Sequence, residues 1–380
     1  MSPVYAFSCR HNIICHHMGE RDTTMTFDSA YVYSILHPHF QQRVLLDEPL
    51  AQHSSFGVGG TADIWIEVGT REELGDLIKL CVQRQWPLLI VGAGSNILFA
   101  DAGVRGIVAS VAFRRYQLEE QRDGTALVIA EAGVRWNDLL KDLIPHGWSG
   151  LEFGIGIPGT LGGGIISNTG AHNHDLGQVL EWIEVLDARG CMNENPPPVF
   201  PVISFRRYPK ESLDLGYRHS RFREGRVTHI DANGQLIIPS RNLIEPTELV
   251  VTLALCVHHD DPARLEAVLQ QHAQTRTHDD PAQRHAGSIF KDPIGTGEEN
   301  ATAATLIAQA GLAGKRHGGA EISKRNANYI LNLDEQGTHA SAGDIAALII
   351  EAHQGVLAQT GISMALNVEL LGAWKFIGAS

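Results

Sequence analysis

A glycine-dense tract near the middle of the chain restricts what this sequence can fold into more than any other feature. Residues 154–159 read GIGIPG, which satisfies the GxGxxG template, and TLGGG follows directly at 160–164. The template marks a Rossmann dinucleotide-binding unit when it follows a strand and opens a helix. Pro158 removes one N–H donor, and three successive glycines disfavour a helix. We therefore expect a loop whose backbone approaches a large planar or phosphorylated ligand, with a Rossmann unit or a set of tight turns as the alternatives.

A second turn rich in small residues supports the same interpretation. Residues 87–91 predict an apolar strand, and Gly92-Ala93-Gly94-Ser95-Asn96 follows it, so that backbone N–H groups can approach a ligand closely. A bound diphosphate needs several convergent N–H donors, which two loops supply better than one. Because the two tracts lie about sixty residues apart, they can come from two subdomains that hold one extended dinucleotide between them.

The composition is that of an ordinary globular protein. The chain has 380 residues, of which 43% are hydrophobic and 19% are charged, and no low-complexity block. A prior of roughly 150 residues per domain predicts two or three domains. The net charge of −13 repels polyanions unless basic residues gather locally, so we expect no nucleic acid partner.

The cysteines and the apolar runs favour a cytoplasmic location. Five cysteines are scattered without a CxxC spacing, which argues against a disulfide framework and for a reducing compartment. No run approaches the roughly eighteen apolar residues of a membrane span, and the N-terminus lacks the apolar core of a signal peptide. We expect no membrane association.

The first forty residues differ from the rest of the chain. Two cysteines and three histidines lie close together there: Cys9, His11, Cys15, His16 and His17. They could in principle ligate a metal, but no matching ligand pair follows downstream, so we predict no metal site. Met18 and Met25 offer alternative starts, and residues 1–40 are expected to form a leader with poor order.

From about Ser54 the pattern is that of an α/β or α+β domain. Residues 62–68 predict a strand, and Thr70 with Glu73 predicts a capping box ahead of a helix with apolar residues to Cys81. A strand at 126–131 and a short amphipathic helix at 136–143 follow.

The remaining stretches are less regular. Residues 192–216, with three prolines at 196–198, are expected to be a loop or insertion, and residues 228–242 a second excursion from the core. Helices are predicted at 301–310 and from Ser341, where Asp344 completes a start signal. We expect a separate C-terminal domain that begins near residue 260.

Seven motifs occur between about Ser54 and Gly372. They are FGVGGTAD (56–63), VGAGSNILFADAGVRGIV (91–108), GLEFGIGIPGTLGGGIISNTGAHNHDLG (150–177), GYRHSRF (216–222), AGSIFKDP (286–293), LIAQAGLAGKRHGGAEISKRNANYILN (306–332) and LNVEL (366–370). In these motifs, and in their order, the chain resembles the UDP-N-acetylenolpyruvoylglucosamine reductase family. Chance could produce one of these matches, but not the series.

The resemblance implies an α+β fold. It has an FAD-binding part of the vanillyl-alcohol-oxidase type, expected here as subdomains at 41–113 and 114–259, and a C-terminal α+β substrate domain at 260–380. FAD would lie between the two subdomains. The residues that the resemblance assigns to FAD are Gly92, Ala93, Gly94, Ser95, Asn96, Gly156, Ile157, Pro158, Gly159 and Gly163. NADPH and a UDP-sugar would be the small-molecule partners, and the protein is expected to be a monomer.

The resemblance also implies a reaction. NADPH reduces the flavin, and the enolpyruvyl substrate then accepts a hydride at C3 from flavin N5, which leaves negative charge on C2 and its carboxylate. Arg218 matches the family's arginine for this charge, and Glu369 matches a glutamate near the same carboxylate. We expect Glu369 to be protonated or held by an arginine or lysine. Ser288 matches the serine that protonates C2, and Lys291 is a candidate to stabilise its transient alkoxide.

Four residues are assigned to the substrate, and two positions depart from the family's pattern. The substrate candidates are Tyr217, Lys291, Asp292 and Gln309. Asp292 stands where an asparagine is usual, which adds a negative charge near a UDP-bearing substrate, and Asn326 replaces a common histidine at a position that looks structural. Between residues 222 and 288 no equivalent of a substrate-covering tyrosine loop is evident, which favours the lidless subclass of the family.

Two other functions stay open at this point. One is an FAD-dependent oxidase of a hydroxy acid or alcohol on the same fold, which would consume oxygen. The other is a non-catalytic nucleotide-binding protein, for which the departures at Asp292 and Asn326 are the only support.

Overall fold

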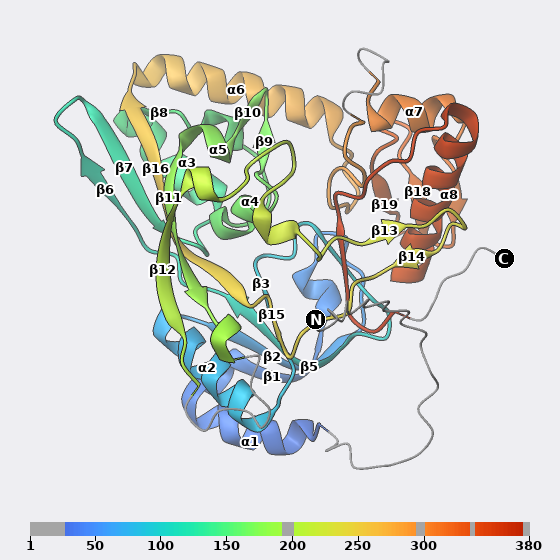
Figure 1. Ribbon diagram of the computed structural model, residues 1–380. Helices are drawn as coiled ribbons and strands as arrows, with labels where there is room; N and C mark the ends of the chain where they lie inside the picture. Colours follow the sequence, from blue (N-terminus) through green and yellow to red (C-terminus); the bar gives the residue numbers. More distant parts are fainter. Residues whose placement is uncertain (1–26, 192–200, 294–300, 335–338, 375–380) are drawn as a thin grey trace, which may run out of the picture.

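The computed structural model describes residues 27–191, 201–293, 301–334 and 339–374. Figure 1 shows three units: a blue N-terminal unit, a green unit with one long helix along its upper side, and an orange and red C-terminal unit. Each contains a hydrophobic cluster of its own. We call them subdomain 1, subdomain 2 and the C-terminal domain.

Subdomain 1 is built on a five-stranded sheet in the order β1-β2-β5-β3-β15. The strands are β1 (Val44–Pro49), β2 (Thr61–Val68), β5 (Val104–Val111), β3 (Leu88–Val91) and β15 (Ile244–Glu245). β1 is antiparallel to β2, and the other neighbours are parallel. Helix α2 (Arg71–Arg84) packs on this sheet and begins where expected, since Thr70 accepts a hydrogen bond from Glu73 N, but among the described residues the reciprocal bond of the predicted capping box is not formed. The Glu73 carboxylate accepts from Gly69 N and pairs with Arg43.

Helix α1 (Ser29–Phe40) belongs to the same core. Asp28 caps it, and its buried residues Val32, Leu36 and Phe40 join the cluster of subdomain 1. The expected leader is therefore wrong for Ser29–Phe40, where an apolar residue at every fourth position forms one helix face. Residues 1–26, with the five metal-ligand candidates, lie outside the described residues.

Subdomain 2 is built on an antiparallel sheet in the order β12-β11-β16-β7-β6, with β8 beside β16. The strands are β12 (Ser204–Pro209), β11 (Leu180–Asp187), β16 (Glu248–His259), β7 (Thr125–Glu131), β6 (Tyr116–Glu120) and β8 (Trp148–Ser149). Helices α3 (Trp136–Leu143), α4 (Leu161–Ile166), α5 (Leu176–Val179) and α6 (Pro262–Asp279), together with the hairpin β9 (Gly170–Ala171) and β10 (His174–Asp175), complete the unit. The strand predicted at 126–131 and the helix predicted at 136–143 are confirmed as β7 and α3.

Two predictions for subdomain 2 are wrong. Residues 204–209, expected in a loop, form the edge strand β12, which pairs with β11 along its whole length although its side chains show no inward–outward alternation. Helix α4 forms despite its three glycines. Thr160 caps it, and a Cβ on Gly162 would lie 2.6 Å from Ala132 Cβ. Close packing on the sheet, which only glycine permits, outweighs the low helix propensity.

The C-terminal domain holds the two predicted helices, confirmed as α7 (Ala303–Gln309) and α8 (Ala342–Thr360), the latter with the Ser341–Asp344 capping box. They pack with a small sheet of β17 (Arg316–His317), β18 (Ala320–Ile322) and β19 (Ile330–Asn332). The segment 228–242 forms the hairpin β13 (His229–Ile230) and β14 (Leu236–Ile237), and its Leu236 belongs to the core of this domain.

The chain crosses between the units more often than the predicted boundaries allow. The boundary at residue 260 precedes α6, whose Leu265 is buried in the cluster of subdomain 2, so the switch to the C-terminal domain follows this helix. Strand β15, within the range predicted for subdomain 2, pairs with β3 of subdomain 1. Near the end of the chain, β20 (Glu369–Leu371) pairs in parallel with β4 (Ile97–Phe99).

Short 3₁₀ helices connect several of these elements, at Gln41–Arg43, Leu50–His53, Ile144–His146, Glu152–Gly154, Arg189–Cys191, Lys210–Ser212 and Arg221–Arg223. None of the helices in the described part of the chain has the length and apolar content needed to cross a bilayer.

Asp101 connects subdomain 1 to the C-terminal domain and provides a first test of this packing. Its two carboxylate oxygens accept from Ala342 N at 2.8 Å and Gly343 N at 2.9 Å, the first N–H groups of α8. Because an anion there satisfies unpaired donors, Asp101→Ala should lower the free energy of unfolding by about 1–2 kcal/mol in urea denaturation. Glu266→Ala, at an exposed position of α6, is the control and should change it little. Equal stability of both variants would contradict the interdomain cap.

His353 on α8 provides a second test, of pH dependence. The side chain is buried, its Nε2 lies 3.2 Å from Ser363 Oγ, and its Nδ1 has no partner among the described residues. Burial lowers the pKa of this imidazole. The unfolded chain therefore binds a proton that the folded protein excludes, and stability present above about pH 6.5 falls as the pH drops toward the folded pKa.

Relative to His353→Gln, the wild type should lose up to about 1.4 kcal/mol of unfolding free energy per pH unit in that window, the limit for one proton. Urea denaturation of both proteins at pH 7.5, 6.5 and 5.5 measures the difference. A difference that stays constant with pH would show that His353 does not titrate on unfolding.

Candidate active site

A central cavity lies where subdomain 1, subdomain 2 and strand β20 meet. Its walls come from Gly92–Asn96, from segment 157–169 with the glycines of α4, from residues 246–250 at the start of β16, and from Glu369. A second, more polar cavity shares the lining residues Gly92, Ala93, Val111 and Thr160 with it and continues to His53, Arg114 and Arg135. Together they form one elongated space between the two subdomains.

The loop Gly92–Asn96 is shaped by close backbone approaches. Gly94 has φ +65°, and a Cβ there would lie 1.9 Å from the His53 carbonyl oxygen, so only glycine fits. Within the described residues, the N–H groups of Ala93, Gly94 and Ser95 donate no hydrogen bond to protein atoms. Successive free N–H groups in a loop favour an anion such as a phosphate.

Most of the residues that the sequence assigned to FAD face the central cavity, namely Gly92, Ala93, Gly94, Ser95, Asn96, Ile157, Pro158 and Gly163. Gly159 packs behind the loop, where its Cβ would lie 2.5 Å from Ser95 Oγ. Gly156 lines a separate cavity beside Arg276. The Asn96 amide donates to the Asn367 carbonyl oxygen at 2.8 Å, so part of this side chain holds the protein together.

The glycine tract is not a Rossmann phosphate site, although a helix follows it. The first N–H groups of α4 are already satisfied: Leu161 N donates to Val134 O, Gly162 N to Ala132 O, and Gly163 N to Thr160 Oγ1. A Rossmann helix presents such groups to a pyrophosphate. Here they anchor α4 to the sheet, and the helix contributes its glycine surface to the cavity wall.

The three candidate catalytic residues come from three distant segments. Glu369 starts β20 and lines the central cavity, and its N–H donates to Asn96 O at 3.0 Å. Ser288 is half-buried, and its carbonyl oxygen accepts from Asn367 Nδ2 at 3.1 Å. Arg218 lies in the tight turn between Gly216 and His219 with φ +51°, and its Nη2 donates to Gly170 O at 2.8 Å. In the described part of the chain these side chains form no hydrogen bond with one another.

A cluster of buried arginines joins these segments, and sequence reasoning missed it. Arg223 has a relative exposure of 2%; burial lowers its pKa, and the nearby Glu369 carboxylate opposes that shift. Arg226 and Arg241 lie 2.7 and 3.8 Å from Glu245 Oε1. Among the described residues, the buried atoms Arg221 Nε, Arg223 Nε and Arg241 Nη1 donate no hydrogen bond. The sequence did contain a signal for this cluster, because five arginines lie between residues 218 and 241 of an acidic chain.

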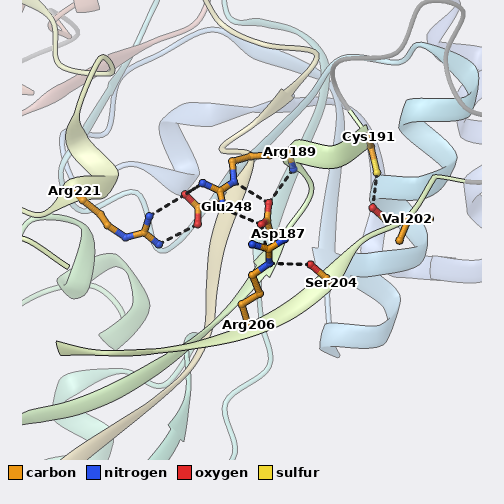
Figure 2. Close-up of polar contacts among 8 residues, drawn as sticks. All are labelled: Asp187, Arg189, Cys191, Val202, Ser204, Arg206, Arg221 and Glu248. Carbon is orange, nitrogen blue, oxygen red and sulfur yellow. Dashed lines mark hydrogen bonds and ion pairs between the residues drawn. The ribbon is translucent and has the colours of Figure 1, made fainter. Parts of the chain in front are cut away.

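Glu248 lines the central cavity, and Figure 2 shows its carboxylate between Arg221 and Arg189. Arg221 donates to both of its carboxylate oxygens, at 2.9 and 3.2 Å, and Arg189 Nη1 lies 3.1 Å from Oε2. Arg189 also binds Asp187, whose pKa it lowers, and Arg206 lies 3.2 Å from the same Asp187 carboxylate. These pairs join the start of β16 to the end of β11 and neutralise the carboxylates locally.

The substrate candidates Tyr217, Lys291 and Asp292 line another cavity, next to residues 360–363. Tyr217 donates its hydroxyl to Asp292 Oδ2 at 3.0 Å, and burial together with this carboxylate raises the Tyr217 pKa. Burial, and then Arg223 and Arg218, lower the pKa of Lys291. A bound anion would relieve this repulsion among cations.

The two departures from the family pattern have local structural partners. Asp292 Oδ1 accepts from Ala303 N at 2.8 Å at the start of α7, so the additional charge is held by a helix N-terminus. Asn326 Oδ1 accepts from Asn328 N in a turn. Gln309 lies on the exposed end of α7, away from the lining of these cavities.

Comparison with known proteins was made against family models, curated proteins and solved structures. A model described as an FAD binding domain matches residues 62–194, and a model described as the C-terminal domain of UDP-N-acetylenolpyruvoylglucosamine reductase matches residues 279–371. UDP-N-acetylenolpyruvoylglucosamine reductase of Heliobacterium modesticaldum is 30% identical over 88% of this chain and 92% of the relative. The enzyme of that name from Chloroflexus aggregans is 34% identical over 86% and 96%.

A solved structure agrees with this relationship. The crystal structure of UDP-N-acetylenolpyruvylglucosamine reductase from Thermus caldophilus superposes with a TM-score of 0.61 at 26% identity, covering 86% of this chain and 97% of that one. Identity of 30–34% over nearly the whole length, with both family models in order, establishes membership. This chain belongs to the UDP-N-acetylenolpyruvoylglucosamine reductase family of FAD-dependent oxidoreductases.

Proposed function

We propose that this protein uses NADPH and bound FAD to reduce UDP-N-acetylenolpyruvoylglucosamine to UDP-N-acetylmuramate, in the synthesis of peptidoglycan precursors. The observation that carries the proposal is the group of cations beside the glycine-lined cavity. Five arginines lie between residues 218 and 241 of a chain whose net charge is −13, and Arg226 lines the cavity. Burial, together with the neighbouring cations, lowers the pKa of Arg223 and of Lys291. Such a site favours a ligand with several negative charges.

The elongated space between the subdomains has the properties that FAD requires. The free N–H groups of Ala93, Gly94 and Ser95 can hold a pyrophosphate, and Arg114 and Arg135 supply cations in the adjoining cavity. Apolar and glycine residues, among them Ile157, Gly163 and Trp136, line the part that can accept a planar ring. Bound FAD would supply two-electron transfer between NADPH and the enolpyruvyl double bond.

The proposed substrate carries a diphosphate and a carboxylate, which match two groups of cations. Lys291 and Tyr217 line a cavity at the surface of the C-terminal domain and would contact the diphosphate. Arg218 would bind the carboxylate. One of its N–H groups donates to Gly170 O, and the others remain for a planar interaction with both carboxylate oxygens.

The family resemblance gives a role to each of the three candidate residues. Reduction of the double bond leaves charge on C2 and its carboxylate, which the Arg218 guanidinium would stabilise. Ser288 Oγ would donate a proton to C2, and Lys291 would serve either to reduce the cost of the alkoxide or to contact the diphosphate. Arg223 and Arg241 lie close enough to Glu369 to interact with its carboxyl group, which supports the alternative in which an arginine holds it.

Ser288→Ala tests the proton-donor role. The variant should retain FAD and be reduced by NADPH at the wild-type rate, because these steps do not need the hydroxyl. Reoxidation by the enolpyruvyl substrate should slow by about 10³-fold, which lies within the roughly 10²–10⁴-fold contribution of one general acid. Anaerobic stopped-flow absorbance follows both half-reactions. Ser212→Ala, at an exposed serine, serves as the control, and wild-type reoxidation by Ser288→Ala would remove Ser288 from the mechanism.

Glu369→Gln tests the carboxylate in the central cavity, with Glu245→Gln as a matched control. Both glutamates interact with Arg241, but Glu369 lines the central cavity and Glu245 does not, although its partner Arg226 does. Loss of the Glu369 charge should lower kcat at least 10-fold with the FAD content unchanged, whereas Glu245→Gln should act mainly on stability. If Glu369→Gln turns over normally, the role belongs elsewhere in this segment, and Asn367, which contacts Ser288, becomes the candidate.

A further inference from the structure

One residue without an assigned role, Asn367, lies two positions before Glu369 and is hydrogen-bonded both to the Ser288 segment and to the loop that faces the proposed FAD site. Its carbonyl oxygen accepts from Asn96 Nδ2 at 2.8 Å, in the loop that faces the proposed FAD site. Its Nδ2 donates to Ser288 O at 3.1 Å, and its N–H donates to Ile289 O at 2.7 Å. Two residues further along the chain, Glu369 N donates to Asn96 O at 3.0 Å.

Arg223 adds the third segment to this arrangement. Its Nη2 donates to Asn367 O at 2.9 Å, and its Nη1 lies 3.4 Å from Arg218 O and 3.5 Å from Asn367 Oδ1. The guanidinium thus bridges the turn that carries Arg218 and the segment that carries Glu369. Only a planar fork with several donors makes these contacts at once, and a lysine ammonium in its place would be a single point charge.

The burial of the Arg223 guanidinium has a cost in free energy that its hydrogen bonds must offset. A guanidinium with 2% relative exposure has lost its hydration, and its Nε has no partner in the described part of the chain. The cost is offset by two backbone carbonyl oxygens and by the Glu369 carboxylate, which raises the Arg223 pKa against the effect of burial. All of these groups belong to segments that carry catalytic candidates.

The candidate side chains form no hydrogen bonds with one another within the described residues, so their relative positions depend on the backbone that carries them. The Arg218 carbonyl, the Ser288 carbonyl and the Asn367 main chain are the atoms that Arg223 and Asn367 hold. A shift of about 1 Å in such a constellation can cost on the order of 100-fold in rate.

We propose that Arg223 and Asn367 are positioning residues for the reaction: Arg223 sets Arg218 relative to Glu369, and the Asn367 amide sets Ser288. This inference rests on the proposed function. Neither side chain needs to touch substrate or FAD. The contact of Asn367 with Arg223 can be tested separately from its contact with Ser288. Asn367→Asp keeps an oxygen for Arg223 Nη1 but replaces the Nδ2 donor by an oxygen that repels Ser288 O.

The test compares Arg223→Met, Arg223→Lys and Asn367→Asp with wild type, each purified with bound FAD and assayed per bound flavin. Asn367→Asp should slow reoxidation by the enolpyruvyl substrate about 10–100-fold, with flavin reduction by NADPH and the substrate KM changed less than about 3-fold. Arg223→Met should lower kcat by at least as much, and Arg223→Lys should recover only a minor part. Asp101→Ala, destabilised at the distant α8 cap, should keep wild-type kcat per flavin and so controls for lost stability.

Each outcome decides the proposal. If the variants at Arg223 and Asn367 lose thermal stability or FAD but keep wild-type kcat per flavin, the two residues are merely structural and the inference is wrong. Should Arg223→Met fail to fold, Arg223→Lys and Asn367→Asp still decide it, because both preserve a polar group at the site. A wild-type protein that binds FAD but does not turn over the UDP substrate overturns the proposed function, and this inference with it.

Discussion

Burial of the Arg223 guanidinium is the constraint on which the rest of the site depends. A cation with 2% relative exposure is stable only where carbonyl oxygens and a carboxylate surround it. The oxygens are supplied by Asn367 and Arg218, and the carboxylate by Glu369. Satisfying this cation therefore requires the end of the chain to lie against the turn at 216–219. The pairing of β20 with β4 and the bonds between Asn96, Asn367 and Glu369 then close the central cavity on one side.

The same packing sets the electrostatics of the cavity. Glu248 and Asp187 are neutralised by Arg189, Arg206 and Arg221, so they fix the wall without repelling an anionic ligand. Asp292, an additional carboxylate for this family, is held by the first N–H of α7 and the Tyr217 hydroxyl. Of the remaining cations, Arg226 lines the central cavity and Lys291 lines the cavity next to residues 360–363. An acidic protein can thus present a cationic site, because its negative charge lies elsewhere or is paired.

Local signals in the sequence predicted the elements that local interactions determine. Thr70 and Ser341 begin helices as expected, because capping is decided by residues three positions apart. Helix α4 was missed because its stability comes from contacts of Gly162 with Ala132, which no local propensity describes. The edge strand β12 was missed for a related reason, since its hydrogen bonds to β11 form without an apolar face.

The motifs placed most of the proposed FAD residues at one cavity, but the hydrogen bond between Arg223 and Asn367, which helps to align the catalytic candidates, joins residues 144 positions apart. Arg223 and Asn367 were not predicted because an arginine and an asparagine in isolation are typical of a protein surface. The central claim, that one site binds FAD, accepts electrons from NADPH and passes them to an enolpyruvyl UDP-sugar, is tested by one anaerobic absorbance titration of the purified protein. The account predicts a flavin band that bleaches with NADPH and returns on addition of the UDP substrate. A band that returns only with oxygen, or no flavin band after addition of FAD, would contradict it.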